Sequence, residues 1–227
     1  MAPNSVYNFN MLIDIVSDTI CPWCFIGKRR LERALADRPE LGVQIGWRPF
    51  QLNPDMPVEG MDRQSYLAAK FGGEARAKRA YSPVIEAAER EGLGIDFDRI
   101  RRTPNTLASH RLIRWAAATG LQHQVVEALF QRYFVQGDDI GDHAVLIEVA
   151  AEAGMDVDLV TQLLAEGRDI DLVKSEDRMA REMGIRGVPC FVFDRRYALS
   201  GAQDPEVILN VIDLAAREAL EKAAQPA

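Results

Sequence analysis

A pair of cysteines between an apolar strand and a helix is the feature that most constrains the fold of this chain. Residues 9–16 are apolar and partly β-branched, which predicts a strand buried on both faces. The motif Cys21-Pro22-Trp23-Cys24 follows, with proline in a position that it favours in a first helical turn. Helix-forming residues then lead to an alternating strand over 43–48. Residues 9–50 are therefore predicted to form a β-α-β unit with the cysteine pair at the start of its helix.

The rest of the chain divides into a helical stretch and a short β-rich end. From 63 to 183 the apolar residues recur at helical spacing, most clearly over 121–134, and the pattern predicts six or seven helices and no strand. Two short β runs follow at 189–193 and 197–199, and a helix is predicted over 205–223. The predicted order is β-α-β, a helical block, then β-β-α.

The charge balance and the N-terminus narrow the functional classes. Lys and Arg number 27 against 34 Asp and Glu, a net charge of −7, which argues against a nucleic-acid partner. Apolar stretches are too short to cross a bilayer, so no membrane partner is predicted. Residues 1–10 lack the basic flank and apolar run of a signal peptide, and a cytoplasmic location is expected. In that reducing compartment a CxxC motif is redox-active or metal-binding more often than structural.

The two cysteines of the motif are predicted to differ in reactivity. The sulfur of Cys21 would lie near the unpaired N–H groups of the helix N-terminus, which favour the thiolate and lower the pKa of the thiol. A lowered pKa makes Cys21 a nucleophile and a good leaving group at neutral pH. Cys24, one turn inside the helix, is expected to be more buried and less acidic, and to resolve a mixed disulfide by attacking it.

Two other interpretations of the cysteines remain. A zinc site needs about four ligands. Cys21, Cys24 and Cys190 supply three, and no histidine is paired with another, so no metal site is predicted. The cysteines could also be inert residues of the core. The strand–CxxC–helix context favours redox chemistry over both.

A second candidate element precedes the late β run. Val188 and Pro189 stand before an apolar segment, and a proline there can be a simple edge residue. In this topology, however, a loop before the third strand would face the CxxC motif. A cis Val188–Pro189 bond would leave the Val188 backbone N–H and C=O free to pair with an extended substrate.

Five sequence blocks carry a resemblance to a known family. They are 17–28, 48–54, 104–112, 184–189 and 200–203. With these blocks in this order, the chain resembles the thioredoxin-fold DsbA-like oxidoreductases, and within them the FrnE-type branch. The resemblance implies an α/β fold, namely a thioredoxin-like fold with a large all-helical insertion domain. Residues 1–56 and 184–227 would form the discontinuous thioredoxin-like domain and 57–183 the insertion, with the active site at their junction.

The resemblance also implies roles for the motif residues. Cys21 would be the catalytic nucleophile, Cys24 the resolving thiol and Pro189 a cis-proline beside them. Kappa-class glutathione transferases and 2-hydroxychromene-2-carboxylate isomerases are related branches that bind glutathione and typically carry serine in place of Cys21. Two cysteines therefore favour a protein-disulfide oxidoreductase of reductase or isomerase type, and the direction of electron flow stays open.

Two alternatives to this function stay open. One is a glutathione-dependent transferase or isomerase acting on a small hydrophobic substrate, and the other is a thioredoxin-fold chaperone or interaction module. No bound cofactor is expected, and glutathione is a candidate co-substrate. The expected partners are a disulfide-containing protein or a small thiol, and analogy within the superfamily makes a homodimer a candidate assembly.

Further residues are candidates for the substrate cleft. They comprise three residues beside the reactive sulfur and four polar residues: Pro22, Trp23, Val188, Asn53, Asn105, His110 and Gln203. The resemblance favours a cleft position for His110, whereas its apolar helix also fits a buried core histidine.

Two single residues have open roles. Asp14 lies in the buried strand, where a carboxylate beneath Cys24 could act as a proton shuttle, and pairing or capping is the structural alternative. Cys190 follows Pro189, and strand alternation should turn it away from Cys21 into the core. It is expected to be a buried structural thiol, with an accessory redox role as the alternative.

Overall fold

A mixed four-stranded sheet forms the centre of the structure. The computed structural model describes residues 10–223. Within them the strand order is β2 (Gly42–Pro49), β1 (Asn10–Ser17), β5 (Cys190–Phe193) and β6 (Tyr197–Ser200). β1 runs parallel to β2 and antiparallel to β5, and this pairing brings Cys190 opposite Val16. Two segments far apart in the sequence thereby become neighbours at the centre of the sheet.

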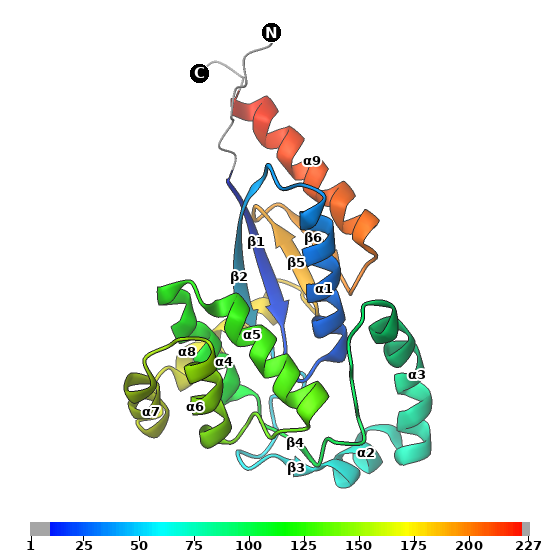
Figure 1. Ribbon diagram of the computed structural model, residues 1–227, viewed down its shortest axis with the longest axis vertical. Helices are drawn as coiled ribbons and strands as arrows, with labels where there is room; N and C mark the ends of the chain where they lie inside the picture. The colour runs from blue at the N-terminus through cyan, green and yellow to red at the C-terminus, as the bar shows by residue number, and fades with distance from the viewer. Residues whose placement is uncertain (1–9, 224–227) are drawn as a thin grey trace.

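The predicted β-α-β unit and the final β-β-α segment are both present. α1 (Pro22–Ala36) makes the crossover that the parallel strands β1 and β2 require. β5 and β6 form the predicted hairpin, and α9 (Pro205–Ala223) has the predicted bounds. α9 packs against α1 and also contacts β5 and β6 (Figure 1). The predicted α/β fold class is confirmed.

A helical block lies between β2 and β5 in the sequence. Its α-helices are α2 (Arg63–Phe71), α3 (Glu74–Arg90), α4 (Leu107–Ala116), α5 (Gln122–Phe130), α6 (His143–Glu152), α7 (Val157–Ala165) and α8 (Ile170–Glu182). A 3₁₀ turn (Ala117–Thr119) follows α4, and a π-helix (Gln131–Gln136) follows α5. The block sits beyond the end of the sheet at which α1 begins (Figure 1), and it therefore faces the cysteine motif. None of the helices in residues 10–223 combines the length and the apolar character that a membrane span requires.

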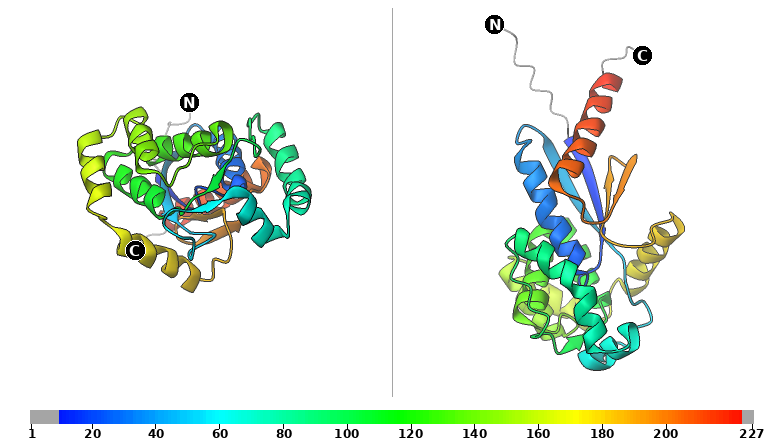
Figure 2. Two further views of the ribbon diagram at one scale, coloured as in Figure 1. Left: turned by 90° about the horizontal axis from the view of Figure 1, so that it is seen from below. Right: turned by 90° about the vertical axis from the view of Figure 1, so that its right-hand side faces the viewer.

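The two faces of the sheet are covered by different helices. Ile13 and Ile15 belong to the buried cluster that includes side chains of α1. Val16 and Cys190 belong to a separate small cluster with Ala180 of α8. Figure 2 shows α1 and α8 on opposite sides of the sheet. Because side chains alternate along a strand, the odd-numbered residues of β1 face α1 and the even-numbered ones face away from it.

One short strand pair within the block departs from the purely helical pattern. β3 (Met61–Asp62) pairs antiparallel with β4 (Arg102–Thr103). Strands of two residues are too short to leave a readable alternation in the sequence. The chain leaves the main sheet after β2 and returns to it at β5. The domain boundaries at 56/57 and 183/184 stay a prediction.

One apolar core continues from the sheet into the helical block. Phe25 of α1 stacks on Phe130 of α5 and on Phe134, with ring centroids 5.1 Å and 6.0 Å apart. All three side chains are buried. For Phe130 and Phe134 this agrees with the apolar spacing over 121–134. The helical block is thus held against the helix that carries the cysteine motif.

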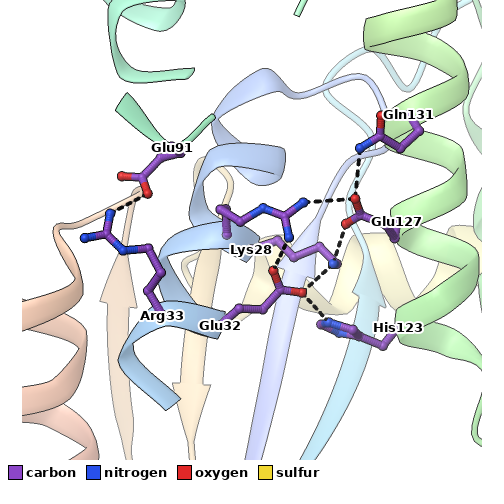
Figure 3. A network of polar contacts seen from close by, with 8 residues as sticks. Lys28, Glu32, Arg33, Glu91, His123, Glu127 and Gln131 are labelled. Carbon is purple, nitrogen blue, oxygen red and sulfur yellow. Dashed lines mark hydrogen bonds and ion pairs between the residues drawn. The ribbon is translucent and has the colours of Figure 1, made fainter. Parts of the chain in front are cut away.

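Charged side chains reinforce the same contact. Lys28 is only 2% exposed, and its Nζ lies 2.6 Å from a carboxylate oxygen of Glu32 and 2.5 Å from one of Glu127. Figure 3 shows Lys28 between Glu32 and Glu127. Arg29 pairs with the same two glutamates. His123 of α5 lies 2.7 Å from Glu32. Lys28 and Arg29, the first two basic residues after the motif, therefore join α1 to α5.

Candidate active site

Cys21 lies at the N-terminus of α1, as the sequence predicts. It is the N-cap residue, with φ −91° and ψ 111°, and Pro22 opens the helix. Its backbone N–H donates to the carbonyl of Asp18 at 3.0 Å, and its carbonyl accepts from the N–H of Cys24 at 3.0 Å. Its thiol donates to the carbonyl of Val188 across 3.5 Å. Cys21 therefore lies at the end of α1 where unpaired backbone N–H groups favour negative charge.

Cys24 lies one turn further along α1 and is less accessible. It is 1% exposed, against 4% for Cys21, and both are free thiols. Burial raises the pKa of the Cys24 thiol well above its usual range, and the neighbouring Cys21 raises it further. Cys24 is therefore protonated at neutral pH in this reduced state. Cys24 is slightly more buried than Cys21, as predicted, and the catalytic roles of both cysteines stay predictions.

The Val188–Pro189 loop packs closely on α1. Its peptide bond is cis. A Cβ atom on Gly27 would lie 3.0 Å from Cγ of Pro189 and 3.1 Å from Cζ of Phe191. Glycine at position 27 therefore permits the close approach of the loop to the helix. Gly27 was not among the predicted site residues, because only this tertiary contact distinguishes it from any other helical glycine.

A cleft of about 320 Å³ opens beside Cys21. Pro22, Trp23 and Val188, three of the predicted substrate-binding residues, line it together with Cys21. The opposite wall comes from the helical block and is largely aromatic. Its side chains include Arg63, Tyr66, Lys70, Tyr81, Phe97, Tyr133 and Phe134. The cysteine motif thus lies where the sheet and the helical block meet.

Two cations line this cleft in contact with neutral groups. Arg63 donates to Oγ1 of Thr103 at 3.1 Å and to the hydroxyl of Tyr81 at 3.0 Å. Lys70 donates to the hydroxyl of Tyr66 at 2.6 Å. Every lining side chain of the cleft that the structure describes is apolar, neutral or basic. Arg63 and Lys70 were not predicted as site residues, because their distance from Cys21 in the sequence gives no sign that they share a cleft with it.

Asn53 does not line the cleft but contacts two residues that do. Its side-chain amide lies within hydrogen-bonding distance of the Tyr66 hydroxyl, at 3.3 Å from Nδ2 and 3.4 Å from Oδ1. Its Oδ1 also accepts from Lys70 at 3.4 Å. Asn53 can therefore orient two residues that line the cleft. It was predicted to contact the substrate itself, whereas the structure gives it this indirect position.

Gln203 does not line the cleft beside Cys21, and its predicted role in substrate binding stays a prediction. Gln203 is exposed in the connection between β6 and α9, and its Nε2 donates to the carbonyl of Ser200 at 2.9 Å. It lies outside the residues that line the cleft. A loop residue has no periodicity from which its direction can be predicted, which is why the sequence did not place it.

Asn105 and His110 also lie outside the lining of this cleft, and their predicted roles in substrate binding stay predictions. Asn105 donates to the carbonyl of Met56 at 2.7 Å and accepts from the N–H of Leu107 at 2.9 Å, so it holds the loop after β2 against the start of α4. His110 is 4% exposed, and its Nε2 lies 3.4 Å from Oδ1 of Asp18. Helical spacing indicated that His110 is buried, but it could not indicate which group His110 would face.

The predicted proton-shuttle position of Asp14 is contradicted by its place in β1. Its carboxylate accepts from Nε of Arg48 at 2.8 Å. As an even-numbered residue it faces away from α1, unlike Ile13 and Ile15, which cluster with Cys24. Structural pairing, the alternative considered for Asp14, is what the structure contains.

Asp18 is a buried carboxylate close to the motif that was not predicted as a site residue. It is fully buried, and its Oδ2 accepts from the N–H of Leu52 at 2.6 Å. Its backbone carbonyl accepts from the N–H of Cys21. Asp18 therefore ties the turn that presents Cys21 to the segment that follows β2.

Cys190 is a buried thiol on the other face of the sheet. It is 3% exposed and packs with Val16, Phe50 and Ala180, apart from the cluster that contains Cys21 and Cys24. Burial raises the pKa of the Cys190 thiol, which disfavours its reactive thiolate. The predicted direction of Cys190 into the core is confirmed. Within residues 10–223, no group of three or more histidine, cysteine or acidic side chains has the arrangement of a metal site.

The sheet topology and the neighbouring cysteines at the start of α1 define a thiol–disulfide oxidoreductase of the thioredoxin fold. Residues 12–213 match the family model of the DSBA-like thioredoxin domain, and the chain belongs to this family. The family resemblance stated from the sequence is thereby confirmed. Its assignment to the FrnE-type branch stays a prediction.

Three solved structures illustrate the relationship. The crystal structure of a probable DsbA oxidoreductase from Streptomyces coelicolor has a TM-score of 0.83 and 32% identity, covering 96% of this chain and 92% of that chain. The cytosolic disulfide reductase DsbM from Pseudomonas aeruginosa with GSH has a TM-score of 0.64 and 18% identity, with coverage of 91% and 99%. A 2-hydroxychromene-2-carboxylate isomerase has a TM-score of 0.66 and 14% identity, with coverage of 95% and 100%. At these low identities, the last two likenesses show the fold alone.

Proposed function

We propose that the chain catalyses thiol–disulfide exchange as a disulfide reductase or isomerase, with Cys21 as the nucleophile and Cys24 as the resolving thiol. The observation that carries this proposal is the position of the Cys21 sulfur. Cys21 caps α1, borders the 320 Å³ cleft, and its sulfur lies 3.5 Å from the Val188 carbonyl. A disulfide bound in the cleft could pair with the Val188 backbone while one of its sulfur atoms meets Cys21.

The reaction would proceed in two exchanges. The Cys21 thiolate attacks one sulfur of a substrate disulfide, the S–S bond breaks, and the other sulfur leaves as a thiolate. Cys24 then loses its proton and attacks the Cys21 sulfur, which releases the remaining substrate thiolate and forms the Cys21–Cys24 disulfide. The substrate gains two electrons and the protein loses two. The raised pKa of Cys24 favours its thiol form until a mixed disulfide has formed.

Glutathione is the proposed electron donor, and the cytoplasm is the proposed location. Two glutathione thiols would reduce the Cys21–Cys24 disulfide and leave as glutathione disulfide, which returns two electrons to the protein. Support comes from the shared fold of DsbM, which is described as a cytosolic disulfide reductase and was solved with GSH. A reducing compartment also favours reduction or isomerisation over net oxidation.

Replacing each cysteine in turn tests the proposed order of steps. Cys24→Ser keeps the nucleophile but cannot resolve, so a mixed disulfide with glutathione should accumulate on Cys21 and appear in the intact mass. Cys21→Ser should form no such adduct and should lower disulfide reduction at least about a thousandfold, the scale of losing an activated nucleophile. Cys190→Ala is the control and should behave like wild type. Undiminished reduction by Cys21→Ser would overturn the proposal.

The same variants separate the two alternatives. A glutathione-dependent transferase or isomerase would keep its activity in Cys21→Ser, because related enzymes carry serine at that position. A chaperone or interaction module would suppress aggregation equally well in wild type and Cys21→Ser and would reduce no disulfide. The aromatic wall of the cleft is the feature that keeps a small hydrophobic substrate under consideration. The homodimer stays a prediction.

A further inference from the structure

We propose that Arg63 and Lys70 form a carboxylate-binding subsite in the cleft, and that the substrate is a small disulfide with carboxylate groups near its sulfur atoms. This inference rests on the proposed exchange at Cys21 and names the class of disulfide that would reach it. Its basis is the opposite wall of the cleft, where two cations share the cavity with Cys21 and the described lining contains no acidic side chain.

Arg63 is a buried cation whose contacts are neutral. The residue is 8% exposed. Two of its N–H groups donate to Thr103 and Tyr81, and its Nε has no hydrogen-bond partner among residues 10–223. A guanidinium carries five N–H donors in a planar fork, and these two hydrogen bonds leave the Nε–H group without a partner among the described residues. Because a desolvated cation without a counter-charge is unfavourable, and the fork matches a carboxylate, an anionic ligand would satisfy it.

One face of α2 presents both cations with an aromatic ring between them. Arg63, Tyr66 and Lys70 are three and four residues apart, so they lie on the same side of the helix, and all three line the cleft. The guanidinium carbon of Arg63 lies 5.6 Å from the centroid of the Tyr66 ring, and Nζ of Lys70 lies 5.2 Å from it. Cation–π contact with one ring therefore holds both charges toward the cleft.

The size and walls of the cleft favour a small molecule. A volume of about 320 Å³ is at the lower end of the range for small-molecule sites. Trp23, Tyr81 and Phe134 supply apolar walls that could cover the carbon skeleton of a ligand. A neutral disulfide in the cleft would leave Arg63 without a counter-charge, whereas a carboxylate would compensate it. Selectivity should therefore depend on charge.

The test compares two disulfides that differ in charge. Reduced protein is mixed with excess glutathione disulfide or with its tetraethyl ester, which lacks the carboxylates, and the rate constant of Cys21–Cys24 oxidation is measured by quenched flow with thiol alkylation. Wild type should favour glutathione disulfide by about tenfold or more, the scale of a hydrogen bond to a charged group. Arg63→Gln should bring the ratio of the two rate constants near one, and Lys70→Gln should lower it about threefold.

A matched control removes the same charge elsewhere. Arg79 is exposed on α3 and does not line the cleft, so Arg79→Gln should keep the wild-type ratio. If Arg63→Gln and Arg79→Gln give equal ratios, the subsite is disproved while exchange at Cys21 stands. If wild type reacts with neither disulfide, the proposed function and the subsite both fail.

Two further outcomes are decisive. An acidic peptide disulfide that loses more rate in Arg63→Gln than glutathione disulfide does would overturn the small-molecule assignment and indicate a protein substrate. Circular dichroism establishes whether Arg63→Gln is folded. If it is not, Lys70→Gln, at an exposed position, decides the question, and an unchanged ratio in that variant disproves the subsite.

Discussion

The cations on the two sides of the cysteine motif show how differently similar residues are used in one protein. Lys28 and Arg29 on α1 lie within 3.0 Å of carboxylate oxygens of Glu32 and Glu127 (Figure 3). Arg63 on α2 is also largely buried, yet within residues 10–223 its hydrogen bonds go only to hydroxyl groups. Lys28 and Arg63 are both buried, so burial does not separate these two cations. The acidic partner distinguishes a cation that holds the fold together from one that is available to a ligand.

The presence or absence of an acidic partner also distinguishes two helices of the helical block, α5 and α2. α5 supplies the acidic partner Glu127 and packs Phe130 on Phe25, so it fixes the block against the helix of the motif. Arg63 and Lys70 of α2 line the cleft, and their hydrogen-bond partners among residues 10–223 are neutral. In a poorly solvated site a paired charge is stabilised and an unpaired one is not. Removing the two kinds of cation should therefore have different consequences.

The largest expected effect is the loss of stability when Lys28 is removed. Lys28→Met should lower the free energy of unfolding by about 3 kcal/mol, because it leaves two carboxylates without their shared buried cation. Arg63→Met, the matched change in the cleft, should alter it by less than about 1 kcal/mol, because the lost hydrogen bonds are offset by the removal of a desolvated charge. Urea denaturation followed by circular dichroism measures both. Equal losses would erase the distinction between the two groups.

The next largest effect is the change with pH in the stability that Glu32 contributes through its contacts with Lys28 and His123. It should be somewhat smaller than the loss caused by Lys28→Met. Burial alone would raise the pKa of Glu32, but hydrogen bonds from His123 and Lys28 outweigh it and lower the pKa from 4.5 to about 2. A carboxylate whose folded-state pKa is lowered adds stability above pH 4.5 and loses that contribution as the pH falls toward 2.

Glu32→Gln is the variant that measures this contribution. It should be about 2 kcal/mol less stable than wild type near neutral pH, after allowance for partial exposure of the carboxylate. The gap should narrow as the pH falls from 4.5 toward 2, because over this interval Glu32 takes up a proton in the unfolded chain while it is still ionised in the folded protein. Unfolding experiments on both proteins across this interval measure the gap. A gap that stays constant with pH would mean that the charge of Glu32 does not stabilise the network.

The smallest expected effect concerns Gly27, which lies between the two regions. Gly27→Ala would place a methyl group 3.0 Å from Cγ of Pro189 and 3.1 Å from Cζ of Phe191. The overpacking should exceed the gain in helix propensity and lower the free energy of unfolding by about 1 kcal/mol. Gly94→Ala is the control, because nothing lies within 4 Å of its added methyl group. A Gly27→Ala protein as stable as Gly94→Ala would show that the loop can move away from α1 without cost.

Much of the fold could be predicted because its signals are local. The apolar run over 9–16, Pro22 after Cys21 and Pro205 after Asp204 mark where β1, α1 and α9 begin, apart from Phe9, which lies outside the described residues. The strands β3 and β4 escaped prediction because each has two residues and pairs with a distant partner. Periodicity also predicted correctly that His110 is buried, but a helical period specifies a face and not the neighbour of that face.

The sequence by itself determined the proposed reacting groups: two cysteines one helical turn apart, a proline that opens the helix, and a second cysteine slightly more buried than the first. These properties depend on residues within one turn of each other. Only the tertiary structure decided what surrounds them. It turned Asp14 away from Cys24, brought Gly27 against Pro189 and set Arg63 across the cleft from Cys21. Those outcomes depend on which elements pack together, and no local pattern along the chain encodes that.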